Sequence, residues 1–369
     1  MLYRFISLGF VLMLFGCAQI NYYAQAVHGG FTLIADAKPI DDWLSDPNTN
    51  IRLKNKLEKA KQIRDFATHE LSLPDNHTYK SYTDLKRPYA LWNIVATPAL
   101  SMKPMQWCFP IAGCVNYRGY YNKEEADQFA TNLQQEGLDV RVIGVPAYST
   151  LGWLNDPILS TFIHYPEPEL ARLMFHELAH QIAYAPGDSP FNEAFATMVE
   201  EVGVEMWLAK YGDNTHRQIH AEQEGRKRSF LVLLMKYRFL LENNYASSAN
   251  DDAKLQKKRI IFQQLRDEYQ ILKSSWGGYT GYDKWFSSPL SNAHLASVAT
   301  YHDFVPGFRA LLAQEKSLPR FYDAVRSLTA LDQNARHQQL TMLTSQATQL
   351  SLQDAGASKN AYMPSMHAR

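Results

Sequence analysis

The chain has 369 residues, more than the roughly 100 to 200 residues usual for one domain, and 46% of them are hydrophobic, so a sizeable core can form. Its 37 basic side chains are balanced by 37 acidic ones. This balance excludes a strong overall field that would favour nucleic acid or an anionic membrane surface, and function must be argued from local sites.

The N-terminus carries the pattern of an export signal over residues 1–16. Arg4 precedes an apolar run from Phe5 to Phe15, which is shorter than the ~20 residues needed to span a bilayer. The run ends in Leu14-Phe15-Gly16-Cys17, which resembles the lipobox of bacterial lipoproteins, in which the signal is cleaved before the cysteine and the cysteine is lipidated. The alternatives are a signal peptide cut elsewhere and a signal anchor that is retained.

The lipobox resemblance also implies an address in the bacterial cell envelope. A lipidated Cys17 would anchor the mature chain to a membrane. Ala18 follows it, in place of the aspartate that retains lipoproteins in the inner membrane of Gram-negative bacteria. We therefore expect a lipid-anchored protein at the outer membrane, facing the periplasm.

Residues 17–99 are expected to form a mostly helical segment. Apolar residues recur at helical spacing from Asn21 to about Ala37 and from Leu53 to Leu71. Prolines punctuate this segment, and each one biases the residue before it away from a helix.

The two cysteines that remain after Cys17 are Cys108 and Cys114. An exported protein commonly pairs an even number of cysteines, so a structural disulfide closing this short loop is predicted. The alternatives are two buried thiols or a metal pair, although five intervening residues and no further cysteine do not suit a zinc site.

A small α/β unit begins near Trp107. Residues 112–121 and 139–145 are strand-like, and residues 124–135 between them are helix-like. We expect this unit to belong to a zincin-like catalytic unit over residues 100–213.

An extended segment is expected to follow the second strand, from Gly144 to Thr150. Pro146 lies in it, and proline is tolerated in a sheet chiefly at an edge. A free edge can accept a peptide as an additional strand, so the segment from Tyr148 to Trp153 is expected to align the substrate backbone.

Two helices joined by a tight turn come next. The first runs from Glu167 to Ala183 and is stopped by Pro186-Gly187. The second begins at Ser189-Pro190, a pair suited to the N-cap and the first helical position, and runs to about Lys210.

The C-terminal part of the chain is expected to be helical over residues 214–352. Long segments lie near residues 215–243, 251–273 and 291–350. The polar stretch over residues 353–369 is expected to be a loosely ordered tail.

The first of the two joined helices contains the string His176-Glu177-Leu178-Ala179-His180, which matches the HExxH pattern. Its histidines lie one helical turn apart and face the same way, which lets both imidazoles bind one ion. Glu177 is placed to take a proton from water rather than to bind the metal. The alternative is a surface helix with two ordinary histidines, but apolar residues on the helix, including Leu173 and Ile182, would exclude bulk water from the ion.

Catalytic zinc usually has three protein ligands, so a further donor is needed. Glu193 is the candidate, because the turn over residues 185–190 can fold the second helix back against the first. The pair Asn192-Glu193 is similar to the Asn-Glu signature of thermolysin-like and aminopeptidase gluzincins, although the gap of twelve residues after His180 is shorter than in those families. The alternatives are Asp188 as the ligand and Glu193 as an ordinary helix-start glutamate.

Glu200 stands seven positions after Glu193, which returns it to nearly the same face of the helix. It could orient a histidine ligand, or hold the free α-amine of a peptide, the feature that separates an aminopeptidase from an endopeptidase. The alternative is a solvated acidic face, because pairs such as Glu200-Glu201 are common on helix surfaces.

Peptide hydrolysis needs a donor besides the metal for its oxyanion, and tyrosine supplies one in many zinc peptidases. Among 21 tyrosines, Tyr282 lies in an aromatic, glycine-rich stretch and Tyr301 lies in a helical pattern. Both are candidates, and the alternative for each is an ordinary core or surface position.

Several longer strings extend the pattern beyond the metal motif. They are Phe175 to Gln181, Phe191 to Glu193, Glu200-Glu201, Trp107 to Cys114, Tyr117 to Tyr120 and Gly144 to Trp153. With these strings the chain resembles the family of predicted bacterial aminopeptidases, lipoproteins that carry HExxH, over most of its mature length. The resemblance implies a zinc metallopeptidase of the bacterial envelope, with aminopeptidase as the family's activity.

The sequence thus predicts an α+β fold, mainly helical with a small mixed sheet, in which a zincin-like unit carries the HExxH active-site helix. One zinc ion per chain would bind His176, His180 and Glu193, because two imidazoles and one carboxylate suit zinc. The expected substrates are peptides, and nucleic acid is not an expected partner. The alternatives are a zinc endopeptidase of envelope proteins and a zinc-stabilised binding lipoprotein without turnover, which would have no use for Glu177.

Overall fold

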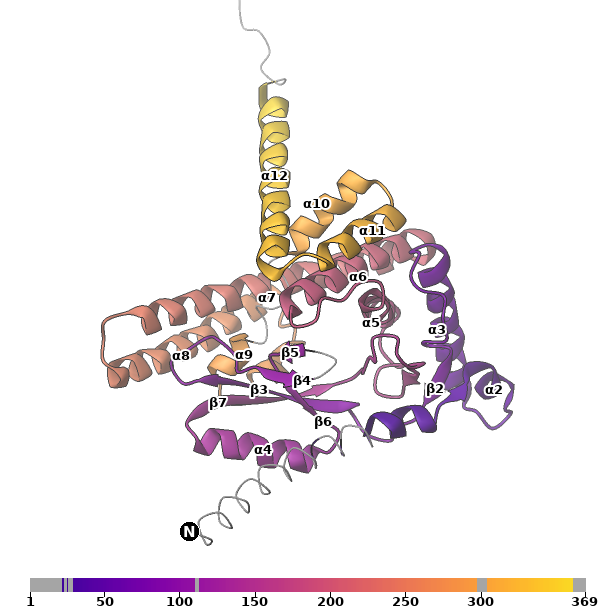
Figure 1. Ribbon diagram of the computed structural model, residues 1–369, viewed down its shortest axis with the longest axis horizontal. Helices are drawn as coiled ribbons and strands as arrows, with labels where there is room; N and C mark the ends of the chain where they lie inside the picture. Colours follow the sequence, from indigo (N-terminus) through magenta and orange to yellow (C-terminus); the bar gives the residue numbers. More distant parts are fainter. Residues whose placement is uncertain (1–21, 23–24, 26–28, 110–112, 297–303, 361–369) are drawn as a thin grey trace, which may run out of the picture.

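The computed structural model describes residues 22, 25, 29–109, 113–296 and 304–360, with side chains up to residue 346. Within these residues the fold is α+β and mainly helical, with small sheets of mixed direction, as the sequence predicts. Figure 1 shows the sheets and helix α4 along one side of the molecule, with most of the remaining helices above and beside them.

The elements alternate between helices and strands in the first half of the chain and are almost entirely helical in the second. The helices are α2 (Ile40–Ser45), α3 (Ile51–His69), α4 (Lys123–Gln135), α5 (Glu167–His180), α6 (Ser189–Tyr211), α7 (Asn214–Ala246), α8 (Asp251–Ser275), η1 (Asp283–Phe286), α9 (Asn292–Ala296), α10 (Val305–Glu315), α11 (Leu318–Thr329) and α12 (Gln333–Asn360). The strands are β1 (Lys38–Pro39), β2 (Ser81–Thr83), β3 (Leu91–Pro98), β4 (Trp107–Phe109), β5 (Gly113–Val115), β6 (Arg118–Tyr120), β7 (Leu138–Val145) and β8 (Ile158–Leu159).

The largest sheet has the order β6-β3-β7, with β3 antiparallel to both neighbours. Strand β3 pairs with β7 along its whole length, from Leu91 opposite Val145 to Pro98 opposite Leu138. Helix α4 packs on this sheet from one side and α9 from the other (Figure 1), so β3 is largely buried on both faces. Because β3 lies before residue 100, this sheet extends outside the unit expected over residues 100–213.

Helices α5 and α6 form the centre of the main hydrophobic core. Helices α3, α10 and α11 contribute to the same core. The two central helices approach closely at Gly203, where an added Cβ would lie 2.6 Å from the ring of Phe175 and 2.8 Å from Leu71. The helix with the HExxH string is therefore held on several sides by packed helices.

A hairpin of α7 and α8 forms a second core and is joined to the sheet by buried polar groups. The side chain of Asn292 donates to the carbonyls of Pro98, Ala99 and Ser101 at 3.0 to 3.3 Å. It also accepts a hydrogen bond from the Tyr245 hydroxyl of α7 at 2.7 Å. One amide group thus connects α9, α7 and the end of β3.

Replacing Asn292 with alanine is expected to lower the free energy of unfolding by about 2 to 4 kcal/mol, because three carbonyls and a tyrosine hydroxyl lose a buried partner. Asn292 is 0% exposed, so water cannot replace the amide. Denaturant unfolding measures the change, and Asn243→Ala, at an exposed position of α7, is the control with little expected effect. Equal stability of the two variants would contradict the role assigned to Asn292.

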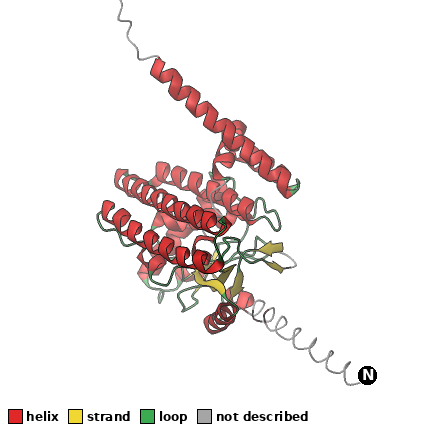
Figure 2. Ribbon diagram, turned by 90° about the vertical axis from the view of Figure 1, so that its left-hand side faces the viewer, coloured by secondary structure: helices red, strands yellow, loops and turns green. Residues whose placement is uncertain are grey.

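Within the described residues, the helical segment expected over residues 291–350 comprises the separate helices α9, α10, α11 and α12. Pro306 and Pro319 lie in the first turns of α10 and α11, and Lys316 ends α10 in the left-handed region with φ of 62°. Helix α12 extends away from the rest of the molecule (Figures 1 and 2) and continues to Asn360, into the stretch expected as a loose tail.

The extended segment expected from Gly144 to Thr150 begins as the end of β7 at Val145 and continues without regular secondary structure into a turn. Leu151 and Gly152 have φ angles of 56° and 81°, which reverse the chain. The backbone N–H of Thr150 donates to the buried carboxylate of Asp156 at 2.9 Å and holds this turn. No strand is assigned to residues 148–153, and alignment of a peptide by strand addition at this segment stays a prediction.

The predicted disulfide between Cys108 and Cys114 is confirmed. The two cysteines face each other across the β4–β5 hairpin. Gly113 of this hairpin adopts φ of 71°, and an added Cβ would lie 2.8 Å from the backbone nitrogen of Gly187. The hairpin thus packs tightly on the loop between α5 and α6.

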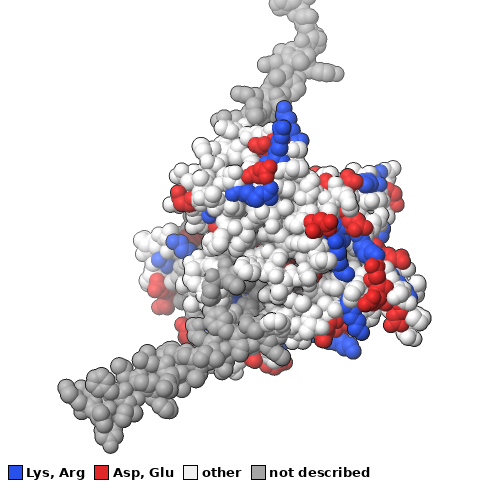
Figure 3. Space-filling model, turned by 45° about the vertical axis from the view of Figure 1, so that its right-hand side comes forward, with Lys and Arg blue, Asp and Glu red and all other residues white. Residues whose placement is uncertain are grey.

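The surface agrees with the balanced charge of the sequence. On the face in Figure 3, Lys and Arg lie beside Asp and Glu, and much of the surface between these clusters has no charged side chain. In the described part of the chain, none of the helices has the length and hydrophobicity of a membrane span.

Candidate metal centre

Helix α5 presents His176 and His180 on one face and packs its other faces into the core. Leu170, Met174 and Leu178 on this helix are 0% exposed, and this burial fixes the rotation of the helix. The helix ends at His180 rather than at the expected Ala183, because the next residues form a turn. Both histidines thus lie at the C-terminal end of a helix that is firmly packed.

The structure brings the three predicted ligands together. The Nε2 atoms of His176 and His180 are 3.2 Å apart. Glu193 of α6 places Oε2 3.3 Å from Nε2 of His176 and Oε1 3.9 Å from Nε2 of His180. A tetrahedral zinc ion with bonds of about 2.0 to 2.2 Å has ligand atoms roughly 3.3 to 3.6 Å apart. The three separations lie within about 0.3 Å of that range, so these residues fit a shared ion after small side-chain adjustments.

The loop between α5 and α6 brings Glu193 to the histidines. Asn192 accepts a hydrogen bond from the backbone N–H of Ala185 at 2.8 Å and donates to the carbonyl of the same residue at 2.9 Å. Asp188, the alternative ligand, is 1% exposed, and its carboxylate is bound by Arg336 and His337. The geometry therefore favours Glu193 over Asp188 as the third donor.

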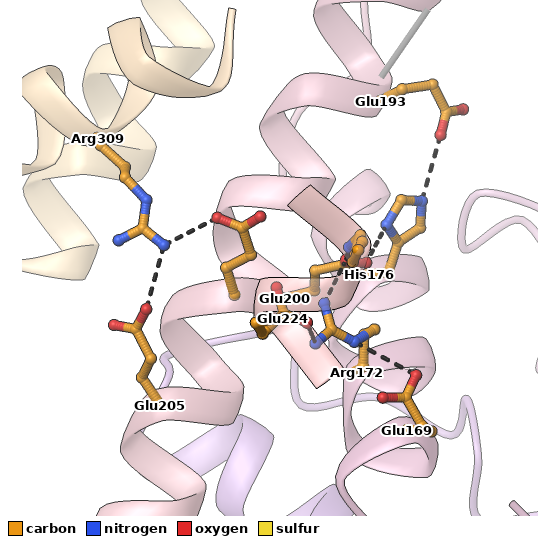
Figure 4. Close-up of polar contacts among 10 residues, drawn as sticks. Glu169, Arg172, His176, Glu193, Glu200, Glu205, Glu224 and Arg309 are labelled. Atoms are coloured by element: carbon orange, nitrogen blue, oxygen red, sulfur yellow. Dashed lines mark hydrogen bonds and ion pairs between the residues drawn. The ribbon is translucent and has the colours of Figure 1, made fainter. Parts of the chain in front are cut away.

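Glu200 supports His176 from the side opposite Glu193 (Figure 4). Its Oε2 accepts a hydrogen bond from Nδ1 of His176 at 2.8 Å, which leaves Nε2 available to a metal. Its Oε1 accepts a hydrogen bond from Arg172 at 3.0 Å, and Arg172 also binds Glu224 of α7 at 2.6 Å. Glu200 is 7% exposed, so it does not belong to a solvated acidic face. Both oxygens are occupied, which favours the orienting role over that of an amine anchor.

We expect Glu200→Gln to weaken zinc binding by roughly 10- to 100-fold, because outer partners of a histidine ligand usually contribute that much. Glutamine can no longer supply a charged acceptor to Nδ1 of His176 and Arg172. The dissociation constant is measured by competition with a zinc indicator. Unchanged affinity would show that Glu200 does not orient the histidine.

Burial and the charges within this cluster together shift the pKa values of its residues. Burial lowers the pKa of His180 to about 4, although Glu193 opposes the shift. Burial also disfavours charge on His176, but hydrogen bonds with Glu193 and Glu200 outweigh it and raise the pKa. Burial acts against ionisation of Glu193, but the hydrogen bond with His176 and the charge of His180 lower its pKa. A neutral His180 and an ionised Glu193 are the forms that bind a metal, whereas His176 must lose its proton to bind one.

Glu177, the predicted base, is half-buried next to the ligands. Burial raises its pKa to about 7, with His176 opposing the shift and the charges of Glu193 and Asp156 adding to it. A hydrogen bond with Ser149 also reaches the carboxylate. A carboxylate with a pKa near neutral can accept a proton and release it again, as a general base must.

Of the two tyrosines named from the sequence, the structure describes Tyr282. Tyr301 and Cys17 lie outside the described residues. Tyr282 stacks on Phe230 of α7, with ring centroids 4.0 Å apart, and packs near Trp276 in the second core. A catalytic role for either tyrosine stays a prediction.

Two other tyrosines lie near Glu193. The ring of Tyr184 is 6.3 Å from that of His180, and burial followed by the charge of Glu193 raises its pKa. Tyr117 is 40% exposed. Desolvation by the surrounding protein, followed by the charge of Glu193, raises its pKa. Tyr184 follows His180 at the spacing of one helical turn, so the sequence could have indicated it. Tyr117 carries no such local signal.

The comparisons with known proteins agree with a peptidase. A family model, Aminopep, described as "Putative aminopeptidase", matches residues 21–340, which include all of α5 and α6. The comparisons with curated proteins and with solved structures gave no match. The family match covers most of the chain and indicates a peptidase that acts on peptides. The chain belongs to the family of putative aminopeptidases.

Proposed function

We propose that this protein is a zinc-dependent aminopeptidase whose metal is held by His176, His180 and Glu193. The observation that carries the proposal is the convergence of their ligand atoms, all within 4.8 Å of one another. Glu200 supports it, because a carboxylate on the far nitrogen of a histidine is typical of metal sites. When bound, zinc would act as a Lewis acid toward the scissile carbonyl and make a water molecule more acidic.

The side chains around the site supply the proton transfers. Glu177 takes the proton of the attacking water and returns it to the leaving amine. Its pKa of about 7 supports both steps, because neither protonation state is strongly favoured at neutral pH. Tyr184 and Tyr117, which lie near Glu193, join Tyr282 and Tyr301 as candidates for the oxyanion donor.

A zinc endopeptidase is the second candidate. The observation in its favour is that Glu200 is bound to His176 and Arg172 and does not present a free carboxylate to a substrate amine. The family membership favours an aminopeptidase. Peptides with free and blocked N-termini distinguish the two activities.

The envelope location is part of the proposal. The disulfide between Cys108 and Cys114 supports an oxidising compartment such as the periplasm. The lipobox ending at Cys17 supports a lipid anchor in the outer membrane. Labelling with a radioactive fatty acid tests the anchor, and loss of the label in Cys17→Ser is the expected result.

The activity is tested on the chain that begins after Cys17, with peptides that differ only in acetylation of the N-terminus. We expect cleavage of free peptides, loss of cleavage with a chelator and recovery with zinc. Equal cleavage of acetylated peptides would support the endopeptidase. Zinc binding without cleavage of any peptide would support the zinc-stabilised binding lipoprotein.

A further inference from the structure

The loop between α5 and α6 sets the distance between the histidines and Glu193. Helix α5 ends at His180 and α6 begins at Ser189, so only a short loop separates the ligands on the two helices. A metal site requires its side chains to be held within about 0.5 Å of the productive geometry. Whatever fixes this loop therefore fixes the third ligand.

Asp188 connects this loop to the C-terminal part of the chain. It is 1% exposed and caps α6 by accepting a hydrogen bond from the backbone N–H of Phe191 at 3.3 Å. Its carboxylate also binds Nε of Arg336 and Nε2 of His337, each at 2.8 Å. A buried carboxylate needs such partners, because its charge has lost the solvation of water.

Arg336 connects the loop to the C-terminal helices. It is 5% exposed and lies 148 positions from Asp188 in sequence. Its Nη1 donates to the carbonyls of Leu331 and Thr329 at 3.0 and 3.3 Å, at the end of α11. The guanidinium also lies 5.0 Å from the ring centre of Phe191, in the first turn of α6. One side chain thus joins the end of α11 and the start of α12 to the start of α6.

We propose that the ion pair of Asp188 and Arg336 is a positioning device for the metal site. It holds the first turn of α6 in place and so keeps Glu193 within reach of the ion bound by the histidines. Helices α11 and α12 thereby take part in metal binding, although their described side chains contribute no ligand. This inference rests on the proposed zinc function.

The chain offers a matched ion pair that does not contact this loop. Lys258 of α8 binds Asp139 of β7 at 2.6 Å, and these side chains are 11% and 16% exposed, against 6% for Arg336 and 1% for Asp188. This pair joins the hairpin to the sheet. Removing both charges of either pair avoids leaving one buried charge alone, so both double variants are expected to fold.

The experiment compares two double variants of the chain that begins after Cys17. The first combines Asp188→Asn and Arg336→Met, and the control combines Asp139→Asn and Lys258→Met. Zinc dissociation constants are measured by indicator competition, and melting temperatures are measured on the metal-free proteins. We expect the first double variant to bind zinc roughly 10- to 100-fold more weakly, the range for outer partners of a metal site. The zinc dissociation constant of the control is expected to stay within about twofold of that of the unaltered chain, even if its melting temperature falls as far as that of the first double variant.

Two outcomes would overturn the inference. One is unchanged zinc affinity without the pair of Asp188 and Arg336. The other is an equal loss in the control, which would make the effect one of general stability. If the unaltered chain binds no zinc, the proposed function itself fails, and the inference fails with it.

Discussion

Replacing Glu177 with glutamine is expected to lower kcat by about 100- to 10,000-fold, the range for removal of a general base. The amide has nearly the same shape as the carboxylate but cannot accept the proton of the attacking water. The ligands His176, His180 and Glu193 are untouched, so zinc content should remain at that of the unaltered chain. The measurement is kcat on a free peptide, together with metal content of the same sample.

The matched control for this variant is Glu205→Gln. Glu205 lies on α6, is exposed and pairs with Arg309, so it makes no contact with the metal ligands that the structure shows. Its kcat should equal that of the unaltered chain. A Glu177→Gln protein with zinc bound and undiminished kcat would contradict the assignment of the base.

Replacing Glu193 with alanine is expected to weaken zinc binding by more than about 100-fold, beyond the range seen for outer partners. Without Glu193, the proposed ion would keep two histidine ligands and lose the carboxylate among its three proposed ligands. Glu193 also pairs with His176 at 3.3 Å, so its loss removes a charge that stabilises the site. The zinc dissociation constant measures the effect, with Glu205→Ala on the same helix as the control. Equal affinity of these two variants would leave the third ligand unassigned and contradict the proposed site.

The parts of the site that the sequence predicted are those set by local geometry. The spacing of His176 and His180 places both on one helix face wherever that helix packs, because it follows from the helical repeat alone. Glu193 could be named because the turn at Pro186-Gly187 and the helix start at Ser189-Pro190 bound a short loop. Short loops bring neighbouring helices together, so little tertiary information was needed.

The parts that the sequence did not predict depend on contacts between distant residues. The sequence left Glu200 with two roles, orienting a histidine ligand or holding a substrate amine. The structure favours the first, because Arg172 donates to the second carboxylate oxygen. The partners of Asp188 lie in the C-terminal helices, 148 and 149 positions away. No periodicity or motif relates such positions, because tertiary packing alone brings them together.

The same distinction applies to the fold. Helices α4, α6 and α8 begin and end close to the residues predicted, because each has an N-cap residue and a clear apolar spacing. The placement of β3 between β6 and β7 was missed, since its partners lie later in the chain. The division of residues 291–350 could have been predicted in part, because Pro306 and Pro319 mark the starts of two helices.

The most direct test of the zinc site is the metal content of the purified chain after extensive dialysis. The double variant that combines His176→Ala and His180→Ala is measured in parallel. The geometry of the three ligands predicts one zinc ion per chain in the unaltered protein and none in the variant. Absence of zinc from the unaltered protein, or equal zinc in both proteins, would contradict the metal centre.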